Sequence, residues 1–312
     1  MANTYPTLLD VARNDKGSGY PVINETVERY PELAVFPADT LDGLAMELEV
    51  LTALPGGSSF RNANEGTART VPTFENRLFQ AMLVSRQVGV DLELANSSKD
   101  KGRFLVNRSK PQMQKAFTDI AKQTWYGRTG ADGSAAIIGD AKGFYGLIEQ
   151  YSADTSHEVD ATGSSAKSSV WFLELGPENI EHLYGNGQTI TMADEWKEET
   201  LYDSNSNPYQ GLTNWINGRV GLRLANKHRA VRIKNIGTAT NKTLTDTMMF
   251  DALRLCEELG MVPNAIFGTP RSFYQLRGGR VATTTDGKPV SRPKDWEGIP
   301  LHYTTNISNN EA

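Results

Sequence analysis

Alternating apolar and polar positions between residues 43 and 95 predict a long two-stranded ribbon. The second segment of this region, FENRLFQAMLVSRQVGVDLELA, keeps a strict period of two from Val88 to Leu94, which is typical of a half-buried strand. The first segment, GLAMELEVLTALP, also alternates, although residues 44–51 fit a helix as well. A polar connection, GGSSFRNANEGTARTVPT, separates the two segments, and we expect it to form a loose tip around residues 60–73.

The expected ribbon carries more apolar side chains than two strands alone can bury. Two-stranded ribbons are marginally stable in water, and each large apolar side chain contributes about 1.5–3 kcal/mol when it is fully buried. The side chains concerned are Leu54, Phe60, Val71, Phe74, Leu78, Phe79, Met82 and Leu83. Either the rest of the chain or another chain must cover them. The polar tip, with Arg61, Glu65 and Arg69, indicates that the ribbon reaches beyond its own body.

A helical period follows in SKPQMQKAFTDIAKQTWYG. Ser109 occupies the N-cap position, Pro111 falls in the first turn, and Gln112 completes the spacing of a capping box. Gly127 is placed as the residue that ends the helix. One apolar stripe consists of Met113, Ala116, Phe117, Ile120, Ala121 and Thr124. The sequence thus predicts a long helix, Pro111 to Tyr126, against which a sheet can pack.

The second half of the chain alternates bursts of strands with a second amphipathic helix, which indicates an α+β fold. We expect strands in SSVWFLELG, IEHLYGNG, NAIFGTP and GIPLHYTTNI, and a helix in TLTDTMMFDALRLCEELG that ends at Gly260. RSFYQLRGG is expected to form a helical turn, and residues 191–208 an acidic excursion. Val220, Leu222 and Leu224, followed by Val231 and Ile233, predict two strands that pair with each other.

Residues 1–42 resemble an arm more than a core. TLLDVARND and NETVERY each fit a short helix, but the connections KGSGYP and PADTLDG leave neither with a hydrophobic centre of its own. Two interpretations stay open, a frayed terminus and a segment that lies on a neighbouring molecule.

Composition and charge narrow the class of protein. The 312 residues carry a net charge of −5, which disfavours a wide DNA-binding face but suits a container for DNA. The N-terminus lacks the apolar core of a signal peptide, and no apolar run is long enough to span a membrane. Cys256 is the only cysteine, so no disulfide can form within one chain, and we expect a reducing, soluble compartment.

The glycine-rich stretch GRTGADGSAAIIGDAKGFYG, residues 127–146, raises the question of a phosphate-binding loop. Such a loop needs a preceding strand, a following helix and a closing Gly-Lys-Ser/Thr, and none of these is present. We expect a mobile surface connection instead. DSNSNPYQGLTN begins like a calcium loop, but Pro208 and Asn214 replace the required glycine and glutamate, so we expect a solvated turn.

Other candidates for catalysis or metal binding also fail on spacing. The four histidines show no pair at ligand spacing; they are His157, His182, His228 and His302. Cys256 lies on the apolar stripe of a helix, where a core role is expected. The acidic cluster Asp194, Glu195, Glu198 and Glu199 fits an exposed loop. The sequence predicts no catalytic site, cofactor or metal, and hence no enzyme.

Positive charge gathers on the predicted strand pair near residues 219–234. The residues concerned are Arg219, Arg223, Lys227, Arg229, Arg232 and Lys234. Two interpretations stay open, solvated strand faces and pairing with carboxylates of an adjoining subunit or an acidic partner.

In order and kind, these features resemble those of tailed-bacteriophage major capsid proteins of the Hong Kong 97 fold. The segments that carry the resemblance are YPTLLDVARND, FRNANEG, KPQMQKAFTDIAKQTWYG, GFYGLIEQY, SSVWFLELGPENIEHLYGNG and HRAVRIKNIG. Each segment is modest alone, but together they cover nearly the whole chain in the family's order.

The resemblance implies a domain plan. It comprises an N-terminal arm (residues 1–42), an extended β-hairpin loop (43–95), a peripheral domain with a spine helix (96–128 and about 206–238) and an axial domain (129–205 and 239–312). The extended loop would lie across the adjacent subunit, which would cover the apolar ribbon. Its candidate intersubunit residues are Phe60, Arg61, Arg69, Phe74, Arg77 and Phe79.

The resemblance also implies a function and partners. Such subunits assemble in the host cytoplasm as hexamers and pentamers, and form the icosahedral capsid of the virion around double-stranded DNA. The implied partners are copies of the same chain, a portal, an optional decoration protein and, through weak nonspecific contact, the packaged DNA. Because only a short arm precedes the loop, a separate scaffolding protein is expected unless the chain is a processed product. No membrane contact is implied.

Two further points bear on this expectation. Some members crosslink their shells through a lysine on the extended loop, and residues 43–98 contain no lysine, so that covalent route is expected to be absent. An encapsulin-like compartment shares the fold and stays open as an alternative function, as does a phage tail structural protein.

Overall fold

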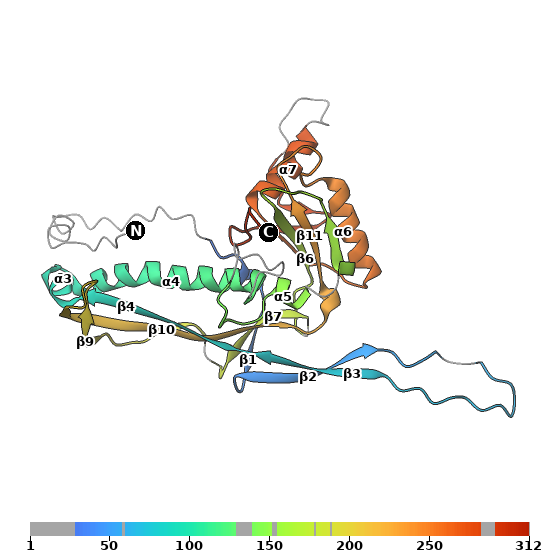
Figure 1. The fold of residues 1–312 in the computed structure, drawn as a ribbon, viewed down its shortest axis with the longest axis horizontal. Helices are drawn as coiled ribbons and strands as arrows, with labels where there is room; N and C mark the ends of the chain where they lie inside the picture. Colours follow the sequence, from blue (N-terminus) through green and yellow to red (C-terminus); the bar gives the residue numbers. More distant parts are fainter. Residues whose placement is uncertain are drawn as a thin grey trace.

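The computed structural model of the protein describes residues 29–57, 60–128, 139–151, 155–177, 179–187, 189–281 and 291–311. Within these residues the chain forms two six-stranded sheets and a separate two-stranded hairpin. Figure 1 shows the hairpin projecting from the body, a long helix lying along one sheet, and the second sheet with its own helices above. The two helices expected in TLLDVARND and NETVERY fall within or across residues 1–28, outside the described part.

The first sheet supports the long helix α4. Its path is β1-β7-β10-β4, and β8 and β9 also pair with β10. The strands are β1 (Ala38–Leu41), β4 (Met82–Asp91), β7 (Ile180–Gly185), β8 (Thr191–Met192), β9 (Lys197–Tyr202) and β10 (Pro208–Leu224). Along β4, alternate residues are buried or half-buried, and α4 (Lys101–Tyr126) covers that face.

The second sheet follows the order β13-β14-β12-β6-β11-β5. Its strands are β5 (Glu158–Asp160), β6 (Ser168–Leu173), β11 (Ala230–Ile236), β12 (Ala265–Gly268), β13 (Asp295–Trp296) and β14 (Ile299–Tyr303). Helices α6 (Asp246–Glu258) and α7 (Pro270–Val281) pack on it and bury Met249, Ala252, Cys256 and Phe273. The central strand β6 is buried at every position, as expected of a strand covered on both faces.

One hydrophobic cluster joins the two sheets to the C-terminal end of α4. The Trp125 ring lies 5.9 Å from that of Trp171 on β6 and 5.4 Å from that of Phe267 on β12. The short helix α5 (Leu147–Tyr151) adds Leu147 to the same cluster. The body of the chain is therefore held together by a continuous core.

The strands after residue 180 differ from expectation in their partners. The two strands expected to pair with each other, β10 and β11, belong to different sheets, and a 3-10 turn (Lys227–Arg229) connects them. The acidic excursion at residues 191–208 contains β8 and β9, because this segment pairs with β10. The division between the two sheets therefore differs from the domain limits expected at residues 205 and 238. Strands β7 to β9 lie in the sheet that supports α4, and β11 lies in the second sheet.

The long helix begins ten residues before the expected start. Asp100, not Ser109, is the N-cap, and its carboxylate accepts a hydrogen bond from the Arg103 amide at 3.0 Å. Pro111 lies inside the helix. The added turns bury Leu105 against α3 (Leu92–Ser97), so tertiary packing outweighs the usual placement of proline in a first turn. Gly127 ends the helix with a φ of 69°, as predicted.

The ribbon is shorter than expected. β2 (Ala45–Ala53) pairs with β3 (Thr73–Gln80), whereas β4 leaves the ribbon and pairs with β10 over ten residues. Leu92 and Leu94, which keep the period of two in sequence, lie in α3 because the Asp91 carboxylate caps the amides of Glu93 and Leu94.

The described part of the arm belongs to the body. The helix α2 (Glu32–Val35) places Glu32 and Phe36 in fully or almost fully buried positions, and β1 pairs in parallel with β7. The Glu32 carboxylate accepts hydrogen bonds from Trp125 Nε1 at 2.8 Å and from Asn306 Nδ2 at 3.0 Å, as well as from the Thr304 hydroxyl. Burial raises the pKa of Glu32 above its ordinary value. Residues 29–42 are therefore anchored between α4 and the C-terminal segment.

The remaining expected elements are confirmed with small shifts. The strands in SSVWFLELG, IEHLYGNG, NAIFGTP and GIPLHYTTNI are β6, β7, β12 and β14. The second amphipathic helix is α6, with Thr245 as its N-cap and Gly260 in the left-handed conformation after its end. RSFYQLRGG extends from a turn into the twelve-residue helix α7.

Candidate assembly interface

The hairpin β2–β3 has two different faces. On one face the cross-strand pairs are Glu47–Leu78, Glu49–Asn76 and Leu51–Phe74, and all six side chains are exposed. On the other face the pairs are Met46–Phe79, Leu48–Arg77 and Val50–Glu75, which are mostly half-buried. On the exposed face, the apolar side chains of Leu51 and Phe74 lie directly opposite each other. Apolar cross-strand pairs of this kind are typical of a sheet face that is covered by another element.

The base of the hairpin is anchored to its own body. Phe79 packs with Leu41, Ala81 and Leu183 in one buried cluster. Arg77, two residues before it, donates from Nη1 to the carbonyl oxygen of Ala225 at 3.4 Å. Phe79 is 6% exposed, so the structure removes it from the expected intersubunit contact. Arg77 is also held mainly by its own chain.

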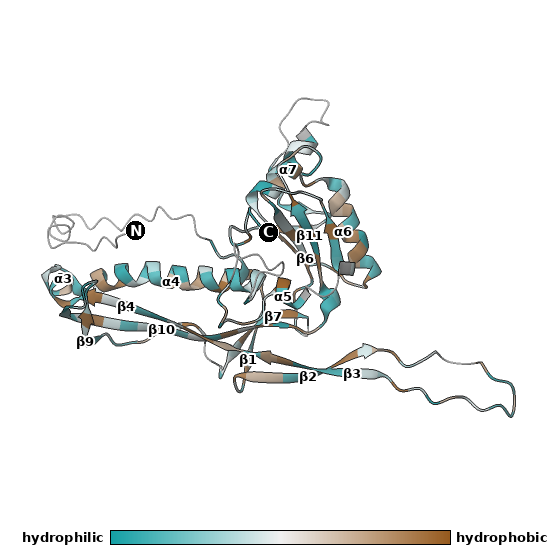
Figure 2. Ribbon diagram, viewed as in Figure 1, coloured by the Kyte–Doolittle hydropathy of each residue, from teal (hydrophilic) through white to brown (hydrophobic). Residues whose placement is uncertain are grey.

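The outer half of the hairpin leaves its apolar side chains open. Leu54 is 80% exposed, Phe60 is fully exposed, and Val71 and Phe74 are 70% and 50% exposed. Figure 2 shows hydrophobic positions continuing outward along the hairpin, away from the body. Isolated exposed apolar residues are common on proteins, but a projecting set of this size marks an interaction surface. The expectation that one isolated chain does not cover its ribbon is confirmed for this part.

The tip has a local structure that presents Phe60. Arg61 donates from Nη1 to the carbonyl oxygen of Glu65 at 3.0 Å, and the Asn62 amide donates to Oε2 of Glu65 at 2.8 Å. Asn64 between them adopts a φ of 70°. The polar residues thus form a turn, while Phe60 and Arg69 stay exposed.

The basic residues near the β10–β11 connection pair with carboxylates of the same chain. Arg223 contacts Glu181 and lies 3.8 Å from Asp39, and Arg229 contacts Glu174 at 2.7 Å. Neither a solvated strand face nor a neighbouring subunit is needed to balance these charges. The carboxylates are 42 to 184 residues away in sequence, so charge pattern alone could not reveal them.

Arg232 and Lys234 share one carboxylate, and Arg232 takes a second. Lys234 Nζ lies 2.5 Å from Glu158 Oε2, while Arg232 lies 3.6 Å from Glu158 and 3.0 Å from Glu311. Burial alone would lower the pKa of Arg232, but attraction to the two carboxylates raises it overall. Glu311 also accepts hydrogen bonds from Tyr126 and Ser169 at 2.8 Å each. The fifth basic residue predicted as a partner contact, Arg219, is half-buried on β10.

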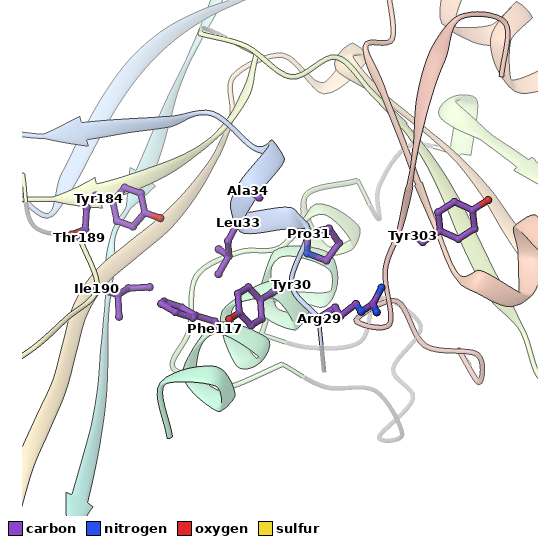
Figure 3. Close-up of a pocket in the computed structure, with 10 residues that line it drawn as sticks. All are labelled: Arg29, Tyr30, Pro31, Leu33, Ala34, Phe117, Tyr184, Thr189, Ile190 and Tyr303. Carbon is purple, nitrogen blue, oxygen red and sulfur yellow. The ribbon is translucent and has the colours of Figure 1, made fainter. Parts of the chain in front are cut away.

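An apolar groove of about 710 Å³ opens beside α4 (Figure 3). Its walls come from the segment before and within α2, apart from Glu32, from Phe117 on α4 and from Tyr184 and Ile190 on the side of β7. Tyr30 and Phe117 lie across from each other with ring centroids 5.2 Å apart. Its ten lining residues are mainly aromatic or aliphatic and include no carboxylate, histidine or thiol.

The expected loops have well-defined ends. Residues 129–138 of the glycine-rich stretch lie outside the described part, but Asp140 and Phe144 are held by Gln123, whose Nε2 donates to both carbonyl oxygens. These described residues are packed against α4 instead of standing free. In the calcium-like loop, Asp203 accepts from the amides of Asn205 and Asn207 at 2.8 Å each, which makes it a closed turn.

Two histidines that look scattered in the sequence meet in the structure. His157 Nε2 lies 2.7 Å from His228 Nδ1, and the rings stack 4.9 Å apart. The pair joins the β10–β11 turn to the start of β5, and no local spacing could have indicated it. Across the described ranges no three His, Cys, Asp or Glu side chains are grouped closely enough to hold a metal ion. Cys256 is buried, and burial raises its pKa to about 12.

The comparison with protein families decides what such a chain is. A model of the family described as major capsid protein GP7 matches residues 39–312, which is most of the chain. This protein belongs to that family of phage major capsid proteins. Its members are structural proteins, and the match favours a capsid subunit over the encapsulin-like compartment and the tail protein that the sequence left open.

Solved structures support the fold of this capsid protein. A chain from the cryo-EM structure of bacteriophage Epsilon15 superposes with a TM-score of 0.69 at 18% identity, covering 100% of this chain and 98% of that one. The bacteriophage JBD30 capsid matches with a TM-score of 0.51 at 11% identity, covering 98% and 99%. These likenesses show the Hong Kong 97-type α+β fold. No curated protein matches the sequence. Among the described residues, none of the helices is both long and apolar enough to cross a bilayer.

Proposed function

We propose that this major capsid protein assembles as hexamers and pentamers into an icosahedral shell that encloses a double-stranded DNA genome, with the hairpin β2–β3 as the contact between neighbouring subunits. The observation that carries the proposal is the open apolar surface of the hairpin. Phe60, Arg61, Arg69 and Phe74 are the contact residues we retain; Phe79 and Arg77 belong to the base.

The exposed side chains supply free energy of the right size for association. Burying Leu54, Phe60, Val71 and Phe74 on a partner would contribute up to about 6–12 kcal/mol, taking about 1.5–3 kcal/mol for each. Association costs on the order of 4–15 kcal/mol in lost translational and rotational freedom. For one hairpin contact, the free energy gained by burial is therefore close to the cost of association. Subunits joined at several such contacts are then stable, whereas an isolated pair is not.

The asymmetry of the contact favours rings. A projecting hairpin on one copy and the body of the next copy form a head-to-tail interface, and such interfaces close into rings when the rotation between subunits permits. Hexameric and pentameric rings are the closed forms from which an icosahedral shell is built. In this proposal the first sheet with α4 forms the peripheral domain, and the second sheet with α6 and α7 forms the axial domain.

Placing a negative charge on the apolar surface of the hairpin tests the proposal. Phe60→Asp and Phe74→Asp should leave the subunit folded, because both side chains are at least half exposed, but should prevent shells. Phe250→Asp is the matched control, since Phe250 is 52% exposed on α6, away from the hairpin. Circular dichroism reports folding, and gradient sedimentation with negative-stain electron microscopy reports particles.

Two results would contradict the proposal in different ways. Particles of wild-type size from both hairpin variants would show that the hairpin is no intersubunit element. A wild-type chain that stays monomeric at micromolar concentration, also when it is expressed with the neighbouring phage genes, would contradict the shell itself.

A further inference from the structure

Positive charge is concentrated on the long helix α4. Its 26 residues contain six Lys or Arg and a single Asp, which leaves a net charge of +5. The other 286 residues contain 26 Lys or Arg and 36 Asp or Glu, a net charge of −10. A mildly acidic subunit thus carries one strongly basic element.

Four of these cations form a row along the helix. Lys101, Arg108, Lys115 and Lys122 are spaced by seven residues, which is close to two turns, so the row drifts by only about 20° per step. At a rise of about 1.5 Å per residue the row is roughly 32 Å long. Within the row, Lys101 is exposed and Lys122 is half-exposed.

The cations are not placed where they would stabilise the helix. Lys101 lies in the first turn, which contains no acidic residue, and the last turn contains no basic residue. A cation near a helix N-terminus opposes the macrodipole and costs about 0.3–1 kcal/mol. Lys115 pairs with Asp119 at 2.6 Å, but that single anion is also 3.7 Å from Arg86, so it balances only part of the charge.

We infer that the basic side of α4 is a contact surface for the phosphate backbone of double-stranded DNA. This inference rests on the proposed function, in which the shell encloses such DNA. Strands β4 and β10 lie along one side of the straight helix α4 (Figure 1). The four cations of the row are exposed or half-exposed. A row of roughly 32 Å spans about nine base pairs at 3.4 Å each. Contacts of this kind carry no base specificity and are weak and salt-dependent.

Removing two of the cations tests the surface directly. Lys101→Gln with Lys122→Gln, both in the row, is compared with Lys197→Gln with Lys294→Gln, a control that makes the same change in charge at exposed sites on β9 and before β13. The probe is a fluorescein-labelled 20-base-pair duplex, and anisotropy is followed between 50 and 200 mM NaCl. The α4 variant should lose DNA affinity, and the slope of log K against log salt should flatten by about 1.8, at about 0.9 per cation removed. The control should keep the wild-type slope.

Each contrary outcome has a distinct meaning. Equal slopes for the two double variants, or no DNA binding by the wild-type chain, would overturn the inference. Binding of poly-L-glutamate in preference to the duplex would assign α4 to an acidic protein segment and would also overturn it. Particle formation is scored by electron microscopy on the same full-length preparations without DNA. The DNA-binding assay tests this inference, whereas particle formation tests the proposed function. An α4 variant that loses DNA affinity but still forms normal shells would therefore affect only the inference.

Discussion

His182 offers a test of how burial of one titratable side chain sets the acid stability of the subunit. The ring is 1% exposed, stacks on Phe36 with centroids 4.9 Å apart, and has its Nε2 3.0 Å from the Thr124 hydroxyl. That hydroxyl donates to the Ile120 carbonyl oxygen, so the neutral imidazole donates to it from Nε2. Protonation would place a charge on Nδ1 in buried surroundings, and burial lowers the pKa of His182 from 6.5 to about 4.

The sign and size of the effect follow from linkage. The folded state binds this proton less readily than the unfolded state, so folding stability falls as the pH drops below 6.5. The loss reaches about 2 kcal/mol at pH 5 and about 3 kcal/mol at pH 4, with 1.36 kcal/mol for each unit of pKa difference. His182→Phe keeps the ring stacking and removes the titration, and Thr124 keeps its bond to Ile120.

Urea unfolding followed by tryptophan fluorescence measures the difference. Wild type and His182→Phe are compared at pH 7.5, 6, 5 and 4.5 and at one protein concentration, so that association contributes equally. The raised pKa of Glu32 also affects both chains equally and cancels in the comparison. The stability of the variant should gain on that of wild type by about 2 kcal/mol between pH 7.5 and pH 5. Parallel stability curves over this range would refute the reasoning.

Two further perturbations test the buried charges and the thiol. Glu311→Ala leaves the buried Arg232 without its closest carboxylate and should lower the free energy of unfolding in urea by about 3–5 kcal/mol. Glu258→Ala breaks an exposed pair on α6 and should lower it by less than about 1 kcal/mol. Equal losses would mean that Arg232 is not buried as described. Cys256 should resist the thiol reagent DTNB at pH 8 in the native protein and react fully in urea, because it is buried with its pKa raised to about 12; complete labelling without denaturant would contradict this.

The sequence identified elements better than partners, and β4 shows why. Its alternation from Met82 to Asp91 correctly predicts a strand with one buried face, because the period of two depends on local geometry. The same period says nothing about which strand lies alongside, and β10, more than 110 residues later, pairs with β4 where the ribbon was expected to continue. The pairing of β10 with β11 fails for the same reason, since both strands have the right period but lie in different sheets.

Local chemistry was misread where two signals competed. Pro111 and Ser109 together fit a helix start, but Asp100 caps the helix and packing of Leu105 extends it past both. The open hairpin was predictable, because an excess of apolar side chains on a two-stranded ribbon is visible in composition alone. The basic row on α4 was also present in the sequence, but its seven-residue spacing became meaningful only when the helix was shown to begin at Lys101.

The two proposed contact surfaces, the hairpin β2–β3 and the basic side of α4, depend on different interactions. The first depends on apolar burial and the second on charge. Arg223, Arg229 and Arg232 are balanced inside the body by Glu181, Glu174 and Glu311. The proposed contact through the hairpin is mainly apolar, and salt does not screen the burial of apolar surface. The inferred contact of α4 with DNA would release counterions and would weaken steeply as salt rises. A shell held together by apolar burial would stay closed at salt concentrations that weaken the contact between α4 and DNA. The DNA could then leave without the shell coming apart.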